Sequence, residues 1–128
     1  MTELHQIYKC EVCGNIIQVV HNSVGELVCC GQPMKLLKEN TVDAATEKHI
    51  PIIEKENGKT IVKVGEVNHP MTQEHYIEWI EVITKDSTHK VFLKPGDEPK
   101  AEFLIEKEIL NVREYCNLHG LWKNEINK

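Results

Sequence analysis

Four cysteines near the start of the chain could together hold one metal ion. Cys10 and Cys13 form a C-x2-C motif, which places two thiols on one tight turn, and Gly14 follows directly. Cys29 and Cys30 supply a second pair. Four thiolates suit a tetrahedral zinc or iron ion with metal–sulfur bonds of about 2.3 Å. Because the side chains of consecutive residues diverge, we expect the adjacent pair to strain the tetrahedron. The spacing does not choose between iron and zinc.

Two other uses of these cysteines compete with metal binding. A set of disulfides would need an oxidising compartment, and the opening MTELHQIYKC lacks the apolar core of a signal peptide. We therefore expect a cytoplasmic protein, in which clustered thiols bind metals more often than they form disulfides. A thioredoxin-like redox motif would need a βαβ context, which the pattern does not provide. The sequence favours a metal site.

Histidine is abundant, and four of the seven stand in surroundings that could serve a metal. His49 and His75 each open an expected strand, and His69 is followed by a proline. His119 lies three residues after Cys116 in C-N-L-H-G, a spacing that allows sulfur and nitrogen to reach one ion. Spacing alone leaves two interpretations open here, a metal site or a free, buried structural cysteine. The remaining histidines have polar neighbours and are interpreted as surface residues: His5, His21 and His89.

The composition is that of an ordinary soluble globular protein. Of the 128 residues, 41% are hydrophobic and 27% are charged. The net charge is −5, basic residues are not clustered, and only 5% of residues are aromatic, which argues against a nucleic-acid-binding surface. No apolar run approaches the roughly 20 residues of a membrane-spanning helix.

Two regions are expected to position these groups. Residues 1–37 carry the four cysteines, and so short a segment needs a metal or disulfides to fold. The polar stretch 38–48 is interpreted as a linker with some ordered structure. Beyond it, β-rich segments alternate with turn residues, which predicts an antiparallel β-sandwich. The expected strands are 50–54, 60–67, 76–84, 91–93, 101–105 and 109–115. The last of them could instead be helical, because good helix formers precede it.

Seven longer stretches, in order along nearly the whole chain, resemble the desulfoferrodoxin-type superoxide reductases. They are Y-K-C-E-V-C-G-N, E-L-V-C-C-G, E-N-T-V-D-A-A-T-E-K-H-I-P, V-G-E-V-N-H-P-M, E-H-Y-I-E-W-I, F-L-K-P-G and R-E-Y-C-N-L-H-G-L-W. The resemblance implies an all-β protein with a small rubredoxin- or desulforedoxin-like metal domain at 1–37. An immunoglobulin-like, neelaredoxin-like β-sandwich would occupy 38–128. The family also implies a homodimer and a rubredoxin-like electron donor.

The same resemblance implies two iron ions per chain. The four cysteines would hold the first in a rubredoxin-like site. The second would have one open position, with four equatorial imidazoles and an axial thiolate from His49, His69, His75, His119 and Cys116. There, superoxide would take up one electron and two protons and leave as hydrogen peroxide, without dioxygen being formed. The implied role is antioxidant defence in an anaerobic or microaerophilic metabolism.

Two charged residues directly precede the first of these histidines. By pattern alone, Glu47 and Lys48 are a solvated charge pair. In the family, the lysine attracts the anion and orders a proton-donating water, and the glutamate can occupy the open iron position in the oxidised state. A local positive charge is physically sensible, because the chain is net negative and the expected substrate is an anion.

Two other classes of function compete with the reductase. One is a small electron-transfer protein that uses only the four-cysteine iron, and the other is a zinc-ribbon interaction module. Neither explains four histidines and a cysteine in matching contexts. A colourless zinc protein, or an iron protein with a single optical site, would support one of them.

Overall fold

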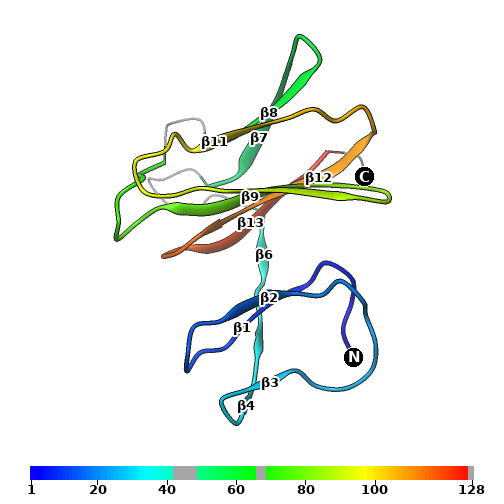
Figure 1. Cartoon of the computed structure of the whole chain (residues 1–128), viewed down its shortest axis with the longest axis vertical. Coiled ribbons are helices and arrows are strands. Elements are labelled where there is room, and N and C mark those ends of the chain that lie inside the picture. Colours follow the sequence, from blue (N-terminus) through cyan, green and yellow to red (C-terminus); the bar gives the residue numbers. More distant parts are fainter. Residues whose placement is uncertain (42–48, 66–68, 127–128) are drawn as a thin grey trace. The chain divides into compact units, whose positions relative to one another are not determined.

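The chain divides into two compact units, which are described separately. The structure is a computed structural model that describes residues 1–41, 49–65 and 69–126. Unit 1 comprises Met1–Lys38 and unit 2 comprises Glu39–Lys128 (Figure 1). Across these ranges every regular element is a β-strand, and there is no helix long and apolar enough to cross a membrane. The expected all-β fold class is confirmed.

Unit 1 consists of very short strands around a very small core. They are β1 (Ile7–Lys9), β2 (Ile16–Gln18), β3 (Val28–Cys29), β4 (Gln32–Pro33) and β5 (Lys35–Leu36). Strand β1 lies between β2 and β5, and β3 pairs with β4 in a separate hairpin. Its buried hydrophobic residues are Ile7, Cys10 and Val19. So little buried apolar surface does not stabilise a fold alone, and a metal held by the cysteines would supply the remainder.

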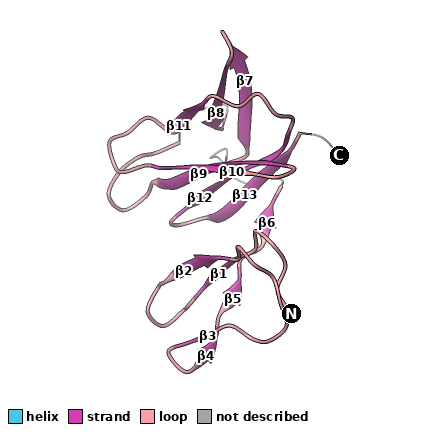
Figure 2. Ribbon diagram, turned by 45° about the vertical axis from the view of Figure 1, so that its right-hand side comes forward, coloured by secondary structure: helices cyan, strands magenta, loops and turns pink. Residues whose placement is uncertain are grey.

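Unit 2 is a β-sandwich. Its strands are β6 (Glu39–Asn40), β7 (Pro51–Glu56), β8 (Lys59–Val64), β9 (Ile77–Thr84), β10 (Thr88–Phe92), β11 (Lys100–Phe103), β12 (Ile109–Cys116) and β13 (Gly120–Glu125). One sheet has the order β10-β9-β12-β13-β6 and the other β11-β8-β7. All neighbours are antiparallel except β13 and β6. The two sheets face each other in Figures 1 and 2, as expected for an immunoglobulin-like sandwich.

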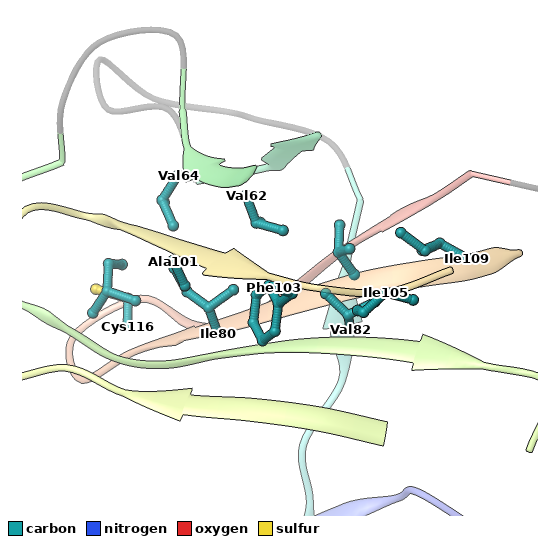
Figure 3. Close-up of a cluster of buried hydrophobic side chains, with 11 residues drawn as sticks. Val62, Val64, Ile80, Val82, Ala101, Phe103, Ile105, Ile109 and Cys116 are labelled. Atoms are coloured by element: carbon teal, nitrogen blue, oxygen red, sulfur yellow. The ribbon is translucent and has the colours of Figure 1, made fainter. Parts of the chain in front are cut away.

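The core of unit 2 lies between these sheets. Alternate residues of β8, Val62 and Val64, contact the cluster from one side, and Ile80 and Val82 of β9 contact it from the other. This is the period-two pattern of strands that bury one face. Cys116 belongs to the same cluster and is fully buried, and Figure 3 shows it at one end of the cluster. The thiol at the end of β12 is therefore set in apolar surroundings.

The main strands of unit 2 follow the expected order with shifted boundaries. The segment that could have been helical is β12, because its backbone pairs with β9 on one side and β13 on the other, which overrides local helix propensity. Strand β10 begins three residues before the expected Val91, where the hairpin register with β9 starts at Thr88. Strand β13 was not expected, and β6 falls within the expected linker. The end of the expected strand 60–67 lies outside the described residues.

Candidate metal centres

The four cysteines of unit 1 converge on one point. Their sulfur atoms all lie within 4.8 Å of one another. The Cys13 and Cys29 sulfurs are 3.6 Å apart, and those of Cys29 and Cys30 are 3.9 Å apart. A tetrahedral ion with bonds of about 2.3 Å needs sulfur–sulfur edges of about 3.8 Å. The donor set therefore fits a mononuclear four-thiolate site.

The backbone explains how two consecutive cysteines reach the same point. Cys30 adopts a left-handed conformation, with φ of 53°, and Gly31 continues it with φ of 74°. Most residues other than glycine avoid this region, because the Cβ atom crowds the following carbonyl oxygen. The left-handed turn brings the Cys30 side chain back toward Cys29. The strain expected from the adjacent pair thus lies partly in the main chain.

The thiols of this cluster have different pKa values, because their hydrogen bonds differ. The Cys13 amide N–H donates to the Cys10 sulfur over 3.5 Å, and this bond is the first cause lowering the pKa of Cys10 from 9.0 to about 6. Hydrogen bonds with the Cys13 and Cys10 side chains raise the pKa of Cys29 to about 12. One thiolate is favoured while a neighbour is held protonated. A bound cation would remove this conflict, because it stabilises all four thiolates.

A second donor cluster lies in unit 2. The structure brings together five side chains whose ligand atoms lie within 4.8 Å of one another: His49, His69, His75, Cys116 and His119. The four imidazole rings form a closed cycle with centroid separations of 4.8, 4.7, 5.0 and 4.8 Å, in the order His49, His69, His75 and His119. Neighbouring rings meet edge to face, at 66° to 83°. Four rings in such a cycle can direct one nitrogen each toward a common centre.

Contacts identify the inward nitrogens. The Nδ1 atom of His119 lies 3.1 Å from His49 Nε2 and 3.9 Å from the Cys116 sulfur. Neighbouring nitrogens around an ion with bonds of about 2.1 Å would be about 3.0 Å apart. The outer nitrogen of His69, Nδ1, lies 2.7 Å from the Pro70 carbonyl oxygen, which can accept its proton and leave the buried Nε2 as donor to a metal. Imidazole nitrogens and a thiolate are a donor set that suits iron.

Trp122 contacts two of the histidines, His49 and His119. The sequence analysis did not identify it as a residue of the site. Its ring stacks on His49 with a centroid separation of 4.7 Å and an angle of 14°. Its indole N–H donates to the His119 carbonyl oxygen over 3.0 Å. Gly120, with φ of 87°, begins β13 directly after His119 and pairs with Cys116. The β12–β13 turn therefore places both Cys116 and His119.

The cluster runs from the interior to the surface. Cys116, His49 and His69 are buried, at 0%, 3% and 4% exposure, whereas His75 is half-buried and His119 is exposed. A small solute would therefore meet the imidazoles of His75 and His119 before the thiol. The grouping favours a metal site over a free structural cysteine, the alternative that spacing left open.

The other sequence expectations have separate outcomes. Glu47 and Lys48 lie outside the described residues. His5, His21 and His89 are not part of either donor cluster among the described residues. Asn117 follows Cys116, and its side chain makes two hydrogen bonds to the segment around His75. Nothing in the sequence indicated this contact, as nothing indicated the contacts of Trp122.

Comparisons with known proteins cover both units. The family model described as "Desulfoferrodoxin, N-terminal domain" matches residues 2–37, and the model described as "Desulfoferrodoxin" matches residues 41–125. The chain is 59% identical over 124 residues to a desulfoferrodoxin homolog of Archaeoglobus fulgidus, covering 97% of this chain and 99% of the relative. It is 58% identical over 125 residues to the desulfoferrodoxin of Syntrophotalea carbinolica, covering 98% and 99%.

A solved structure matches over both units as well. It is the superoxide reductase of Treponema pallidum, with a TM-score of 0.79 and 29% sequence identity. The match covers 94% of this chain and 97% of that protein.

Proposed function

The chain belongs to the desulfoferrodoxin family, and from this premise we propose which of its residues carry each step of the reaction. The protein is a superoxide reductase with two iron sites, and it reduces superoxide by one electron to hydrogen peroxide without forming dioxygen. We propose that the catalytic iron is held by His49, His69, His75, His119 and Cys116. The observation that carries this assignment is the closed cycle of four imidazole rings beside a buried thiol.

When bound there, ferrous iron supplies the single electron that superoxide takes up. The chain holds the imidazole rings in orientation, as the Pro70 carbonyl does for His69 and the stacked Trp122 ring does for His49. The buried Cys116 thiolate adds electron density from the interior. Two protons complete hydrogen peroxide, and water can deliver them because the site reaches the surface at His119.

We assign the approach of substrate to the residues just before His49. The chain is net negative, with a formal charge of −5, so the anionic substrate needs a local positive charge at the mouth of the site. Lys48 would supply this charge and order a proton-donating water. The Glu47 carboxylate would compete for the open position once the iron is oxidised.

The four-cysteine site is assigned an accessory role. Cys10, Cys13, Cys29 and Cys30 would fill all four positions of a tetrahedral ion, so that no position would be left for a substrate. This iron would stabilise a desulforedoxin-like domain at 1–37, attached to the reductase domain at 38–128. A rubredoxin-like protein would be the electron donor. We further propose a cytoplasmic homodimer that detoxifies superoxide.

Metal analysis and optical spectra test the ligand assignment. We expect two iron ions per chain, and absorption from both ferric–thiolate sites after oxidation. Cys116→Ser should remove the absorption of the second site and leave that of the four-cysteine site. Retention of both absorptions in Cys116→Ser would overturn the assignment. A single optical site in the wild-type protein would instead support the electron-transfer alternative.

A further inference from the structure

Two residues outside the proposed ligand set, Thr72 and Asn117, hold the backbone of His75 in place. His75 lies two residues before the start of β9, in the segment that leads from His69 into this strand. Neighbouring loop residues Thr72 and Glu74 are exposed. A ligand on such a loop needs a specific means of holding its backbone, because loops move more than the strands they connect.

Two peptide groups flank the His75 Cα atom, and together they offer two N–H donors and two carbonyl acceptors. Thr72 engages one donor and one acceptor. The His75 N–H donates to the Thr72 carbonyl oxygen over 3.3 Å and to its hydroxyl oxygen over 3.2 Å. The His75 carbonyl oxygen accepts from the Thr72 N–H over 2.9 Å and from its hydroxyl over 3.3 Å.

The Asn117 side chain engages the other two groups. Its Oδ1 atom accepts from the Tyr76 N–H over 3.0 Å, and its Nδ2 donates to the Glu74 carbonyl oxygen over 3.0 Å. The Asn117 main-chain N–H adds a bond to the Tyr76 carbonyl oxygen over 3.2 Å. The amide thus behaves like an additional peptide group of a neighbouring strand, and it fixes both peptide planes on which the direction of the His75 side chain depends.

Asn117 itself is placed by the residue before it. Cys116 ends β12, and its Cα pairs with Ile77 at the start of β9, after an irregularity in the ladder between Tyr115 and Cys116. Asn117 therefore stands between Cys116 and His119 in the chain and contacts the segment that carries His75. Its side chain therefore joins the segment that carries His75 to the segment that carries Cys116 and His119.

We propose that Asn117 is a positioning residue for the catalytic iron, holding His75 in register with Cys116 and His119 through its side-chain amide. This inference rests on the proposed ligand set, in which His75 binds the iron. Asn117 touches neither the iron nor the substrate, so its effect would reach the iron through the orientation of the His75 ring. Loss of such supporting partners typically costs roughly 10- to 100-fold in metal affinity or activity.

The test uses the iron-loaded full-length protein with Asn117→Ala. We measure the rate at which a ferrous chelator removes iron, and the electron paramagnetic resonance spectrum of the oxidised second site. Removal of that iron should accelerate roughly 10- to 100-fold, and the spectrum should change. The four-cysteine iron of the same molecule is an internal control, and its release should keep the wild-type rate. Asn111→Ala, near the start of β12, is the control for losing an asparagine side chain away from the histidines, and it should leave both readouts at their wild-type values.

Two further variants keep the test decisive. Asn117→Asp retains the acceptor for the Tyr76 N–H but loses the donor to Glu74, so it should change iron release and spectrum in the same direction if Asn117→Ala does not fold. Thr72→Val removes only the hydroxyl bonds and leaves the main-chain bonds of Thr72, so its effect should be smaller.

The outcomes separate the inference from the function on which it rests. If the Asn117 variants release iron at the wild-type rate and keep the wild-type spectrum, the positioning role is overturned. This holds even if their melting temperatures are lower. His75→Ala is measured beside them. If His75→Ala changes both readouts and the Asn117 variants change neither, only the positioning role is overturned. If His75→Ala also changes neither, the proposed ligand set is wrong and the inference falls with it.

Discussion

Replacing Trp122 separates two kinds of support for the second cluster. The indole makes one hydrogen bond, from its N–H to the His119 carbonyl oxygen over 3.0 Å, and one stacking contact, with His49 at 4.7 Å. Trp122→Phe keeps an aromatic ring for the stack and removes the hydrogen bond. Trp122→Leu removes both and leaves unfilled volume, because Trp122 is 8% exposed.

The expected losses in unfolding free energy follow from these contacts. One hydrogen bond contributes about 1 kcal/mol net, which is the expected cost of Trp122→Phe. In a domain of 60–100 residues this corresponds to a fall in melting temperature of about 4–8 °C. The lost stack adds ~1 kcal/mol and the lost volume a similar amount, so Trp122→Leu should cost about 3 kcal/mol.

Thermal unfolding and the ferric spectrum of the oxidised protein are the assays. We expect a modest spectral change in Trp122→Phe, where only the His119 backbone is released, and a larger one in Trp122→Leu. Trp79→Phe is a control, because Trp79 stacks on Tyr115 with Lys90 over its ring and contacts no histidine of the cluster in the described structure. It should lower stability and leave the spectrum unchanged. A wild-type ferric spectrum in Trp122→Leu would refute the reasoning, since the indole would then contribute to the stability of the fold and not to the orientation of the histidines.

Three further predictions concern charge. Glu81→Gln should lower the unfolding free energy of unit 2 by about 3–5 kcal/mol in thermal denaturation, because it breaks the buried ion pair with Arg113 and leaves Glu39 as the carboxylate paired with that guanidinium among the described residues; a loss below about 1 kcal/mol would contradict this. Lys48→Ile should slow the bimolecular reaction with superoxide in pulse radiolysis and flatten its salt dependence, whereas an unchanged rate and slope would exclude steering by Lys48. Zinc binding to the metal-free four-cysteine site should release protons and tighten as pH rises, because the pKa of Cys29 is raised to about 12 and only thiolates bind; calorimetric heats that do not depend on the buffer's ionisation enthalpy would disprove it.

The sequence was most informative where the donors are close together in the chain. Cys10 and Cys13 share a motif, and four thiols within 21 positions leave few other interpretations. Their convergence depended on a left-handed backbone at Cys30, which residue types do not reveal. The second cluster was harder to predict, because His49 and His119 are 70 positions apart and meet only through long-range strand pairing. Without the family resemblance, Cys116 and His119 could have been assigned only as a possible pair.

The supporting residues lay beyond pattern reasoning for a different reason. Trp122 acts through a ring face and one N–H, and Asn117 through an amide that imitates a peptide group. Neither role has a characteristic spacing, since each depends on which backbone lies opposite in the folded state. The same holds for β6, where two residues of the expected linker pair with β13.

The different spans of the two donor sets have a consequence for how the protein is made. All four thiols of the first site lie between positions 10 and 30, so they leave the ribosome before any ligand of the second site and can capture a metal while that site is still being translated. The second site needs a hairpin that ends at Glu125 and must close a loop of some 70 residues between His49 and His119. It therefore cannot form before Glu125 has been synthesised. Until then the nascent chain offers one complete set of metal ligands, and the β12–β13 hairpin completes the second.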